Sequence, residues 1–226
     1  MLTLSEIINS SRLGYVRHYD MAPVLREYVA RFKRSQGLIY VGANTGDELP
    51  LCKSLADRVY AFEPISVDSV WSHLTKHQDH KTQCYNYALS DSEGEFDMYP
   101  ASNNYQSSSL FQPGTHVNEF DFVRFTDTVK IQTRRLDSFD FVSSCDTVIM
   151  DVQGAELKVL NGMTDFSNFR LFILEFISYN MYQGACTFDD LLARLQPLGF
   201  EYWESFGIYN NPQTQVFAGN AVFFKE

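Results

Sequence analysis

LIYVGANTGDE, which runs from Leu38 to Glu48, is the stretch that decides the fold of this chain. Apolar residues lead straight into a turn that contains Gly42 and Gly46, and the acids Asp47 and Glu48 follow. A buried strand that ends in a glycine turn before a helix forms a pocket for a polar ligand at its carboxyl end. The glycines let the backbone approach that ligand closely. The stretch therefore predicts an α/β fold with a binding site at this sheet edge.

Apolar runs alternate with helical patterns along most of the chain, which is typical of parallel strands joined by crossover helices. The expected strands span 37–42, 58–64, 83–90, 146–152 and 170–176, and the expected helices lie within 48–57, 66–77 and 187–200. The third helix is the clearest, because four apolar residues follow i, i+3, i+4, i+7 spacing between Thr187 as cap and Pro197 as terminator. The stretches 201–210 and 220–226 predict an antiparallel terminal hairpin.

One segment, from Glu93 to Arg135, breaks the alternation of strands and helices. Both of its ends alternate polar and apolar residues and predict a β excursion. Its polar middle is too long for an ordinary connection, and loops of that kind are often lids or binding loops. We further expect residues 1–36 to form a helical segment that covers the substrate site, and residues 37–226 to form the main domain.

Composition narrows the class of protein. The 226 residues carry 18 basic and 28 acidic side chains, a formal net charge of −10, and 45% are hydrophobic. An acidic surface repels phosphate backbones and anionic lipid heads, so neither nucleic acid nor a membrane is an expected partner. No apolar run reaches the roughly 20 residues of a membrane span, and no secretory signal is recognisable. Four separated cysteines predict reduced, mostly buried thiols in a cytoplasmic protein. A homodimer is compatible with these features.

An acid at a fixed distance from the glycine turn points to an adenosine-type cofactor. Glu63 ends the second expected strand 21 residues beyond Gly42, which matches the spacing at which an acid reaches a ribose diol. The turn reads GxNxG, whereas a turn that binds pyrophosphate reads GxGxxG. Asp47 and Glu48 would repel a pyrophosphate but tolerate an amino-acid tail and a sulfonium. S-adenosylmethionine (SAM) therefore fits this turn better than NAD.

Several motifs together resemble one known family. VGANTGDE, FEP, ALSDSEGEF, SSSL, RRLDSF and DVQGAE occur in the order seen in the FkbM-type, SAM-dependent class I methyltransferases. The resemblance covers roughly residues 37–176. It implies a Rossmann-like, seven-stranded, mostly parallel sheet with helices on both faces and SAM across the carboxyl ends of the first strands. It also implies O-methylation of a small molecule or a glycan.

The resemblance assigns cofactor-binding roles by position. The methionine part would lie against Gly42, Ala43, Asn44 and Gly46, with Tyr40 and Asp47 beside them. Glu63, followed by Pro64, would bind the ribose. Backbone groups of Ala88 and Leu89, with Ser90 and Asp91 nearby, would meet the adenine.

The chain departs from the family pattern in two places. Many members carry an acid two residues before the first glycine, where this chain has Tyr40. Asp151 or a backbone carbonyl are the substitutes that remain for holding the SAM ammonium. The family also has a lysine two residues before Asp151, where this chain has Ile149.

Three carboxylates are candidates for chemistry. Asp151 ends the fourth strand, and we expect it to act as general base or orienting acceptor. The alternatives are a ligand of the SAM ammonium and a cap for the following helix. Glu156 lies in the first turn of that helix, where it either touches substrate or only favours the helix dipole. Glu175 lies in an apolar strand, so its carboxylate needs a partner that the active-site edge would supply.

The long loop supplies the remaining candidates. His116 is a possible base from that loop, or a solvent-exposed histidine with no role. Polar residues of the loop are expected either to bind hydroxyls of a sugar-like acceptor or only to solvate the loop: Asn103, Asn104, Ser107, Ser108 and Ser109.

Other chemistries are disfavoured. No spacing of ligands indicates a metal, and the amino-methylating signature [DN]PP[YF] is absent after the fourth strand. Two alternatives to a SAM-dependent O-methyltransferase stay open from the sequence. One is an NAD-dependent oxidoreductase, and the other is a non-catalytic protein of the SAM fold that serves as a binding partner.

Overall fold

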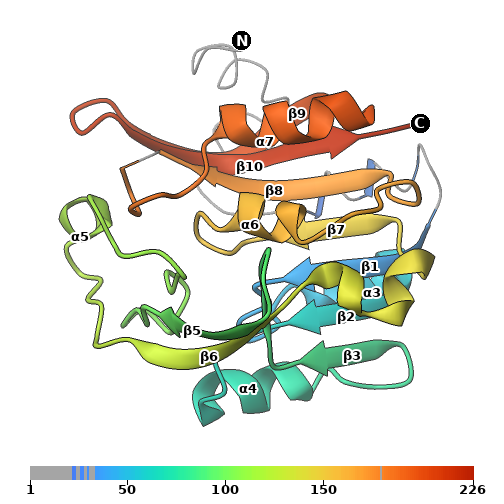
Figure 1. Ribbon diagram of the computed structural model, residues 1–226, viewed down its shortest axis with the longest axis horizontal. Coiled ribbons are helices and arrows are strands. Elements are labelled where there is room, and N and C mark those ends of the chain that lie inside the picture. Colours follow the sequence, from blue (N-terminus) through green and yellow to red (C-terminus); the bar gives the residue numbers. More distant parts are fainter. Residues whose placement is uncertain (1–21, 24–25, 28–29, 31–33, 179) are drawn as a thin grey trace.

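The computed structural model describes residues 22–23, 26–27, 30, 34–178 and 180–226. Seven strands form one sheet in the order β3-β2-β1-β7-β8-β10-β9 (Figure 1). Their bounds are β1 Ser35–Val41, β2 Ala56–Phe62, β3 Thr82–Tyr85, β7 Thr147–Met150, β8 Leu171–Ile177, β9 Glu201–Asn211 and β10 Val216–Phe224. The first five strands in spatial order are parallel, and β10 is antiparallel to both of its neighbours. The predicted parallel sheet with an antiparallel terminal hairpin is confirmed.

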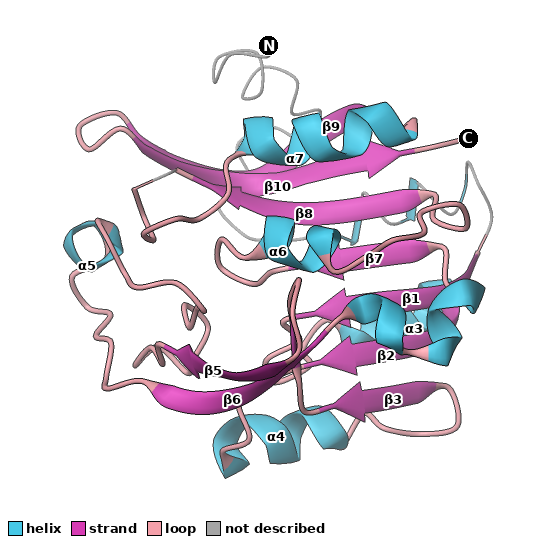
Figure 2. Ribbon diagram, in the orientation of Figure 1, coloured by secondary structure: helices cyan, strands magenta, loops and turns pink. Residues whose placement is uncertain are grey.

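Helices pack on both faces of this sheet (Figure 2). Their bounds are α3 Leu49–Leu55, α4 Asp68–Thr75, α6 Glu156–Asn161 and α7 Phe188–Leu195, and short 3₁₀ helices span Leu136–Ser138, Asp140–Ser144 and Gln196–Leu198. Successive residues of a strand point to opposite faces. In β1, Leu38 and Tyr40 accordingly join the apolar layer that contains residues of α3 and α4, while Ile39 and Val41 join the layer under α6 and α7.

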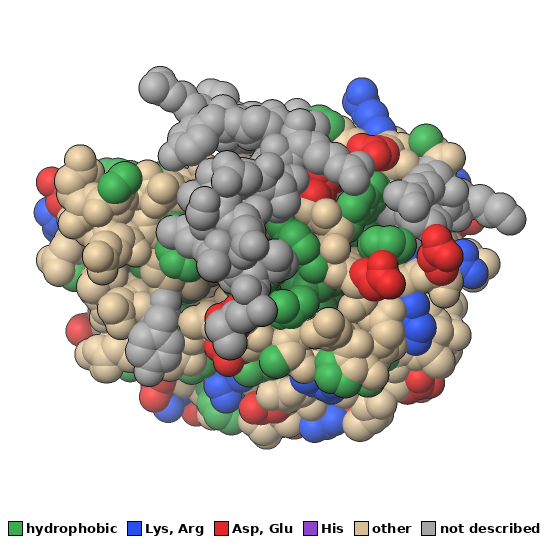
Figure 3. All heavy atoms as spheres, turned by 90° about the horizontal axis from the view of Figure 1, so that it is seen from above, with side chains coloured by type: hydrophobic (Ala, Val, Ile, Leu, Met, Phe, Trp, Pro, Cys, Tyr) green, Lys and Arg blue, Asp and Glu red, His purple; other side chains and the backbone are tan. Residues whose placement is uncertain are grey.

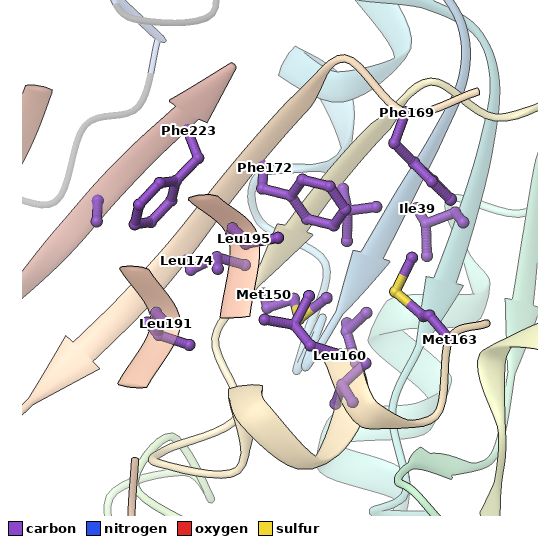
Figure 4. Packing of buried hydrophobic residues seen from close by; sticks show 14 of the residues in the cluster. Ile39, Met150, Leu160, Met163, Phe169, Phe172, Leu174, Leu191, Leu195 and Phe223 are labelled. Carbon is purple, nitrogen blue, oxygen red and sulfur yellow. The ribbon is translucent and has the colours of Figure 1, made fainter. Parts of the chain in front are cut away.

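The larger layer lies between the sheet and helices α6 and α7 (Figure 4). Leu191 and Leu195 of α7 and Leu160 of α6 point toward side chains of the strands, and all three are fully buried. Burying each such side chain contributes about 1.5–3 kcal/mol. Helix α7 begins as predicted, because Thr187 accepts from the Asp190 amide while the Asp190 carboxylate accepts from Thr187 in a reciprocal capping box.

The predicted excursion forms a second sheet over one end of the molecule. Its strands are β4 Ala88–Leu89, β6 Val129–Arg134 and β5 Gly94–Met98, in the order β4-β6-β5, and helix α5 (His116–Glu119) lies between β5 and β6. The expectation of one strand over 83–90 is wrong, because β3 ends at Tyr85. The Asn86 amide then donates to the carbonyls of Glu63 and Pro64, which turns the chain out of the main sheet.

The terminal hairpin extends beyond the sheet and reaches helix α5. Tyr209 and Asn211, near the end of β9, both donate to the Glu119 carboxylate. The ring of Phe120 lies 5.4 Å from that of Tyr209. The hairpin and the excursion, distant in sequence, therefore meet at the carboxyl end of the sheet.

The remaining expectations concern the N-terminal segment, the cysteines, membrane spans and the surface charge. Most of the segment 1–36 lies outside the described residues, so its role as a cover stays a prediction. The four cysteines are free thiols, three of them buried. Among the described residues, none of the helices has the length and hydropathy of a bilayer span. On the face seen in Figure 3, acidic and basic side chains of the described residues are interspersed.

Candidate active site

A cavity of about 510 Å³ lies at the carboxyl ends of β1, β2, β7 and β8. Residues from three parts of the chain line it. The sheet edge and the turns that follow it supply 40–45, 47–48, 63–64, 87–89, 151–153, 155, 175 and 177. The excursion supplies 98, 103, 105–108, 110, 116, 120 and 122–123, and the segments around the terminal hairpin supply 181, 209 and 218. The predicted location of the site at this sheet edge therefore coincides with the cavity.

The backbone of the glycine turn lines the cavity. The space beside Gly42 and Gly46, where other residues have a Cβ, is taken up by neighbouring protein atoms. Gly42 has φ +81°, and a Cβ there would lie 1.9 Å from the Asp151 carbonyl oxygen. The turn thus packs directly against the end of β7. Gly46 does not line the cavity, and a Cβ on it would meet side chains of α3 and α4. Ala43 and Asn44 lie between these glycines and do line it.

Glu63 is held rigidly at the end of β2. Its two carboxylate oxygens accept from the backbone amides of Asn44, at 2.9 Å, and Ile65, at 2.8 Å. The side chain is 5% exposed, and burial raises the pKa of this carboxyl to about 7 although both amides oppose the shift. Each oxygen keeps a lone pair for another donor. The carboxylate is therefore positioned to accept from a ligand that carries two hydroxyls.

Tyr40 occupies the position where the family resemblance expects an acid, and its hydroxyl contacts an acid from another element. The ring is buried, and the hydroxyl donates to Glu48 at 3.3 Å. Burial raises the pKa of Glu48, and the nearby charge of Asp151 contributes to the shift. Both residues line the cavity, as does the exposed Asp47. The sequence interpretation treated Glu48 as a charge that repels pyrophosphate and tolerates a sulfonium, and it missed the hydrogen bond with Tyr40.

Asp151 and Glu175 form a carboxyl pair at the floor of the cavity. The side-chain amide of Gln153 donates to both of them, at 2.8 Å to Asp151 and 2.6 Å to Glu175. Burial and the charges of Asp151 and Glu156 raise the pKa of Glu175 well above its ordinary value. Burial also raises the pKa of Asp151, but hydrogen bonds from Gln153 and Glu175 oppose that shift. Glu175 is therefore the member of the pair that is more readily protonated.

Glu156 lies beneath this floor and does not line the cavity. The side chain is fully buried, and it accepts from the Val152 amide at 3.0 Å and from the Cys186 thiol at 3.4 Å. Burial raises the pKa of this carboxyl to about 7. Of the two roles expected from the sequence, the geometry favours a structural one at the start of α6 over contact with substrate.

The adenine side of the expected site is apolar. Pro64, Ala88 and Leu89 line the cavity together with Tyr87. Ser90 is buried outside the lining, where its amide donates to the Arg134 carbonyl and its hydroxyl to Asp91. The position of Ser90 therefore does not favour direct contact with a cofactor.

The serine- and asparagine-rich loop forms one side of the cavity. Asn103, Ser107 and Ser108 line it, whereas Asn104 and Ser109 do not. Asn104 instead accepts from the Asn44 side chain through its carbonyl. The Ser109 hydroxyl donates to the Gln153 carbonyl at 2.7 Å. The loop is thus tied to the glycine turn and to the floor of the cavity.

His116 lines the cavity, but the expectation of an exposed loop histidine is wrong. The residue begins α5 and is 2% exposed, with its ring 5.0–5.4 Å from those of Phe120, Phe125 and Tyr182. Burial lowers its pKa, so the imidazole is neutral at physiological pH. Within the described part of the chain, its Nδ1 has no hydrogen-bond partner.

The charge of the cavity restricts what it can hold. Five acidic side chains line it (Asp47, Glu48, Glu63, Asp151 and Glu175), and its described lining contains no lysine or arginine. Burial raises the pKa of four of them, and neighbouring acids add to the shift at Glu48, Glu63 and Glu175. A bound cation would oppose these shifts, whereas a pyrophosphate would increase them. Among the described residues, no group of His, Cys, Asp or Glu is arranged to hold a metal ion.

Comparison with known proteins identifies the family of this chain. A model of the methyltransferase FkbM domain matches residues 41–202, which include the glycine turn, Glu63 and the carboxyl pair. The chain belongs to the FkbM methyltransferase family. This methyltransferase is 24% identical over 208 residues to 2-O-methyltransferase NoeI from Sinorhizobium fredii (strain NBRC 101917 / NGR234), with 86% of each chain covered.

Solved structures of methyltransferases are similar to this chain at low sequence identity. Magnesium protoporphyrin IX methyltransferase ChlM from Synechocystis PCC 6803, with bound SAH, superposes with a TM-score of 0.50 at 12% identity, over 90% of this chain and 80% of that one. Burkholderia thailandensis 1,6-didemethyltoxoflavin-N1-methyltransferase gives 0.48 at 12% identity, over 91% and 77%. The fold is the predicted Rossmann-like class I methyltransferase fold.

The residues of the cavity fit the cofactor of this family. SAM is a cation at its sulfur, which suits an acidic cavity without lysine or arginine in its described lining. A ribose diol suits the two-point acceptor Glu63. The enzyme is a SAM-dependent methyltransferase, so the readings as a dehydrogenase or as a non-catalytic partner protein are set aside.

Proposed function

We propose that this methyltransferase transfers a methyl group to a hydroxyl of a small molecule or a glycan. The observation that carries the proposal is the Asp151–Glu175 pair, two carboxyl groups that line the cavity and share the Gln153 amide as donor. A carboxylate there can take up the proton that an attacking hydroxyl must release. The similarity to an enzyme named as a 2-O-methyltransferase supports the same choice of acceptor atom.

The residues that would hold SAM lie along the sheet edge. Glu63 would accept from the ribose hydroxyls, and the backbone of Gly42, Ala43 and Asn44 would contact the amino-acid end. Ala88 and Leu89 would pack on the adenine. SAM, when bound, would supply a methyl group activated by its positive sulfur.

The acceptor would lie on the side of the cavity formed by the excursion. Asn103, Ser107 and Ser108 offer polar groups there, and Phe120 and Tyr209 offer rings. Alignment of the acceptor is the main task in an in-line displacement, and a lining that offers both polar groups and aromatic rings suits an acceptor ring that bears hydroxyls. The Asp151 carboxylate would take the proton of the reacting hydroxyl, and removing that proton contributes about 10²–10⁴-fold. His116, neutral and in the same cavity, is the second candidate for this role.

The test is methyl transfer by the purified full chain with SAM and a panel of neutral sugars, glycosides and hydroxylated polyketides. Release of the demethylated cofactor and a mass gain on an acceptor oxygen would support the proposal. Transfer only to nitrogen or carbon atoms would overturn it.

Two variants then separate the roles of the acids. Asp151→Asn is expected to lower turnover about 10²-fold or more while SAM binding changes little. Asp97→Asn, in an exposed pair with Lys130, is the matched control and should leave both unchanged. If Asp151→Asn abolishes SAM binding instead, Asp151 holds the cofactor and is not the base.

A further inference from the structure

Gln153 makes more contacts in the floor of the cavity than its place in a turn requires. Its side-chain nitrogen donates to Asp151 at 2.8 Å and to Glu175 at 2.6 Å. Its backbone has φ +54°, a left-handed conformation that residues other than glycine, asparagine and aspartate rarely adopt. The side chain is thus aimed at the carboxyl pair by an unfavourable backbone angle.

Tyr182 lies at the other end of the Gln153 amide. The amide nitrogen faces two carboxyl groups, so its oxygen faces the other way, and it lies 2.9 Å from the Tyr182 hydroxyl. That hydroxyl is also 2.8 Å from the Ser107 carbonyl, so its single proton is shared between two acceptors. Tyr182 is fully buried, with its ring against those of His116 and Phe125. The contact connects the amide to the core and to the loop that lines the cavity.

We propose that Gln153 is a positioning residue, held by Tyr182, whose amide bridges the two members of the carboxyl pair and keeps Asp151 as a carboxylate in the cavity lining. The inference rests on the proposed function for its role in turnover. Without the amide, both carboxyl groups would lose a neutral donor, and each would take up a proton more readily.

The surroundings of the pair make this donor necessary. Glu48 before α3, Glu63 after β2 and Glu156 in α6 all act on Asp151 or Glu175 as neighbouring acids. Tyr182 and His116 are neutral. Among the described residues, no lysine or arginine forms an ion pair with either member. Hydrogen bonds from Gln153 lower the pKa of both carboxyl groups against the burial that raises them.

The test is a pH titration of the carboxyl groups in the ligand-free full chain by ¹³C NMR, with Asp151→Asn and Glu175→Gln as assignment variants. Gln153→Asn keeps an amide and suits the left-handed backbone, but it is one methylene shorter and cannot reach both carboxyl groups. Tyr182→Phe keeps the ring and removes only the hydroxyl. In both variants we expect the Asp151 midpoint to move to higher pH, and in Tyr182→Phe by less.

The chain contains a matched pair of controls. Tyr85 donates to the Gln83 side chain at 2.6 Å in β3, outside the cavity lining. Gln83→Asn and Tyr85→Phe repeat the two changes there and should leave the Asp151 titration unchanged. An unchanged Asp151 midpoint in Gln153→Asn and Tyr182→Phe, with melting temperatures near wild type, would overturn the inference. If Gln153→Asn does not fold, Tyr182→Phe alone decides.

The same variants separate this inference from the proposed function. Once an acceptor is known, the acid limb of the rate profile should move to higher pH in Gln153→Asn, because a larger fraction of Asp151 is then protonated. A titration that shifts while no acceptor oxygen is methylated removes only the proposed function. Methylated hydroxyls with an unshifted titration remove only the role of Gln153.

Discussion

Replacing Glu63 by glutamine tests the cofactor site with the smallest change in shape. The wild-type carboxylate accepts from two backbone amides, of Asn44 and Ile65. In Glu63→Gln one of the two oxygens becomes an NH₂ group, so a donor faces one of the backbone donors. A buried amide left without an acceptor costs about 1–3 kcal/mol. Because the site borders a cavity that admits water, we expect the lower half of that range.

The loss in cofactor affinity follows from the same geometry. A charge-assisted hydrogen bond to a ribose hydroxyl contributes about 1.5–3 kcal/mol. Losing one such bond raises the dissociation constant by about tenfold to a hundredfold. Calorimetric titration with the demethylated cofactor measures this directly, and a thermal melt of each protein checks the fold. Glu95→Gln, at an exposed position of β5, is the control and should bind as wild type does.

The pH dependence supplies a second arm of the experiment. The folded-state pKa of Glu63 is about 7, above its ordinary value of 4.5. Protonation of Glu63 therefore stabilises the fold below about pH 4.5, and this contribution is lost as the pH rises through 7. Ribose hydroxyls favour the ionised carboxylate, so cofactor affinity should rise over the same interval, and Glu63→Gln should lack that part of the rise. A folded Glu63→Gln protein that binds within twofold of wild type at pH 8 would refute the ribose assignment.

Three further changes test how the site is held together. Gly42→Ala places a Cβ 1.9 Å from the Asp151 carbonyl, so we expect a loss of roughly 3 kcal/mol or more in denaturant unfolding; near-native stability would contradict the close packing. Thr187→Ala removes the capping box of α7 and should cost about 1 kcal/mol in the same assay, whereas no change would mean that the cap is unimportant. Glu119→Ala removes the acceptor of Tyr209; amide exchange at the hairpin tip should quicken while global stability changes by less than about 0.5 kcal/mol, and unaltered exchange would exclude this contact as a restraint.

The fold could be predicted from local pattern because each signal is short-ranged. The apolar strand before Gly42, the spacing of Glu63 and the 3.6-residue period after Thr187 are all visible within a few turns of chain. Parallel strands bring their carboxyl ends to one edge, so residues that follow strands in the sequence meet in space. Glu63 and Asp151 follow different strands, and both line the same cavity.

The remaining site residues could not be predicted because their partners are distant in sequence. Tyr182 contacts Ser107 across 75 positions and Gln153 across 29, and nothing in the local pattern marks such a contact. The burial of His116 depends on Phe125 and Tyr182, which reach it from different segments. The sequence offered one signal for this contact, which was Gln153 itself. It is a long amide side chain two residues after Asp151, in the DVQGAE motif.

The chain departs from the family pattern at Tyr40, but the Tyr40 hydroxyl contacts a nearby acid. In place of an acid two residues before Gly42, the chain has a buried phenol, and a phenol alone cannot neutralise a cation. Tyr40 donates to Glu48, and that hydrogen bond lowers the pKa of Glu48 against burial, which favours the carboxylate at the cavity lining. An acid at the residue before α3 therefore lines the cavity beside Tyr40, although β1 itself carries none there. A change at one position of a motif does not remove a charge from a site when a neighbour in space carries it.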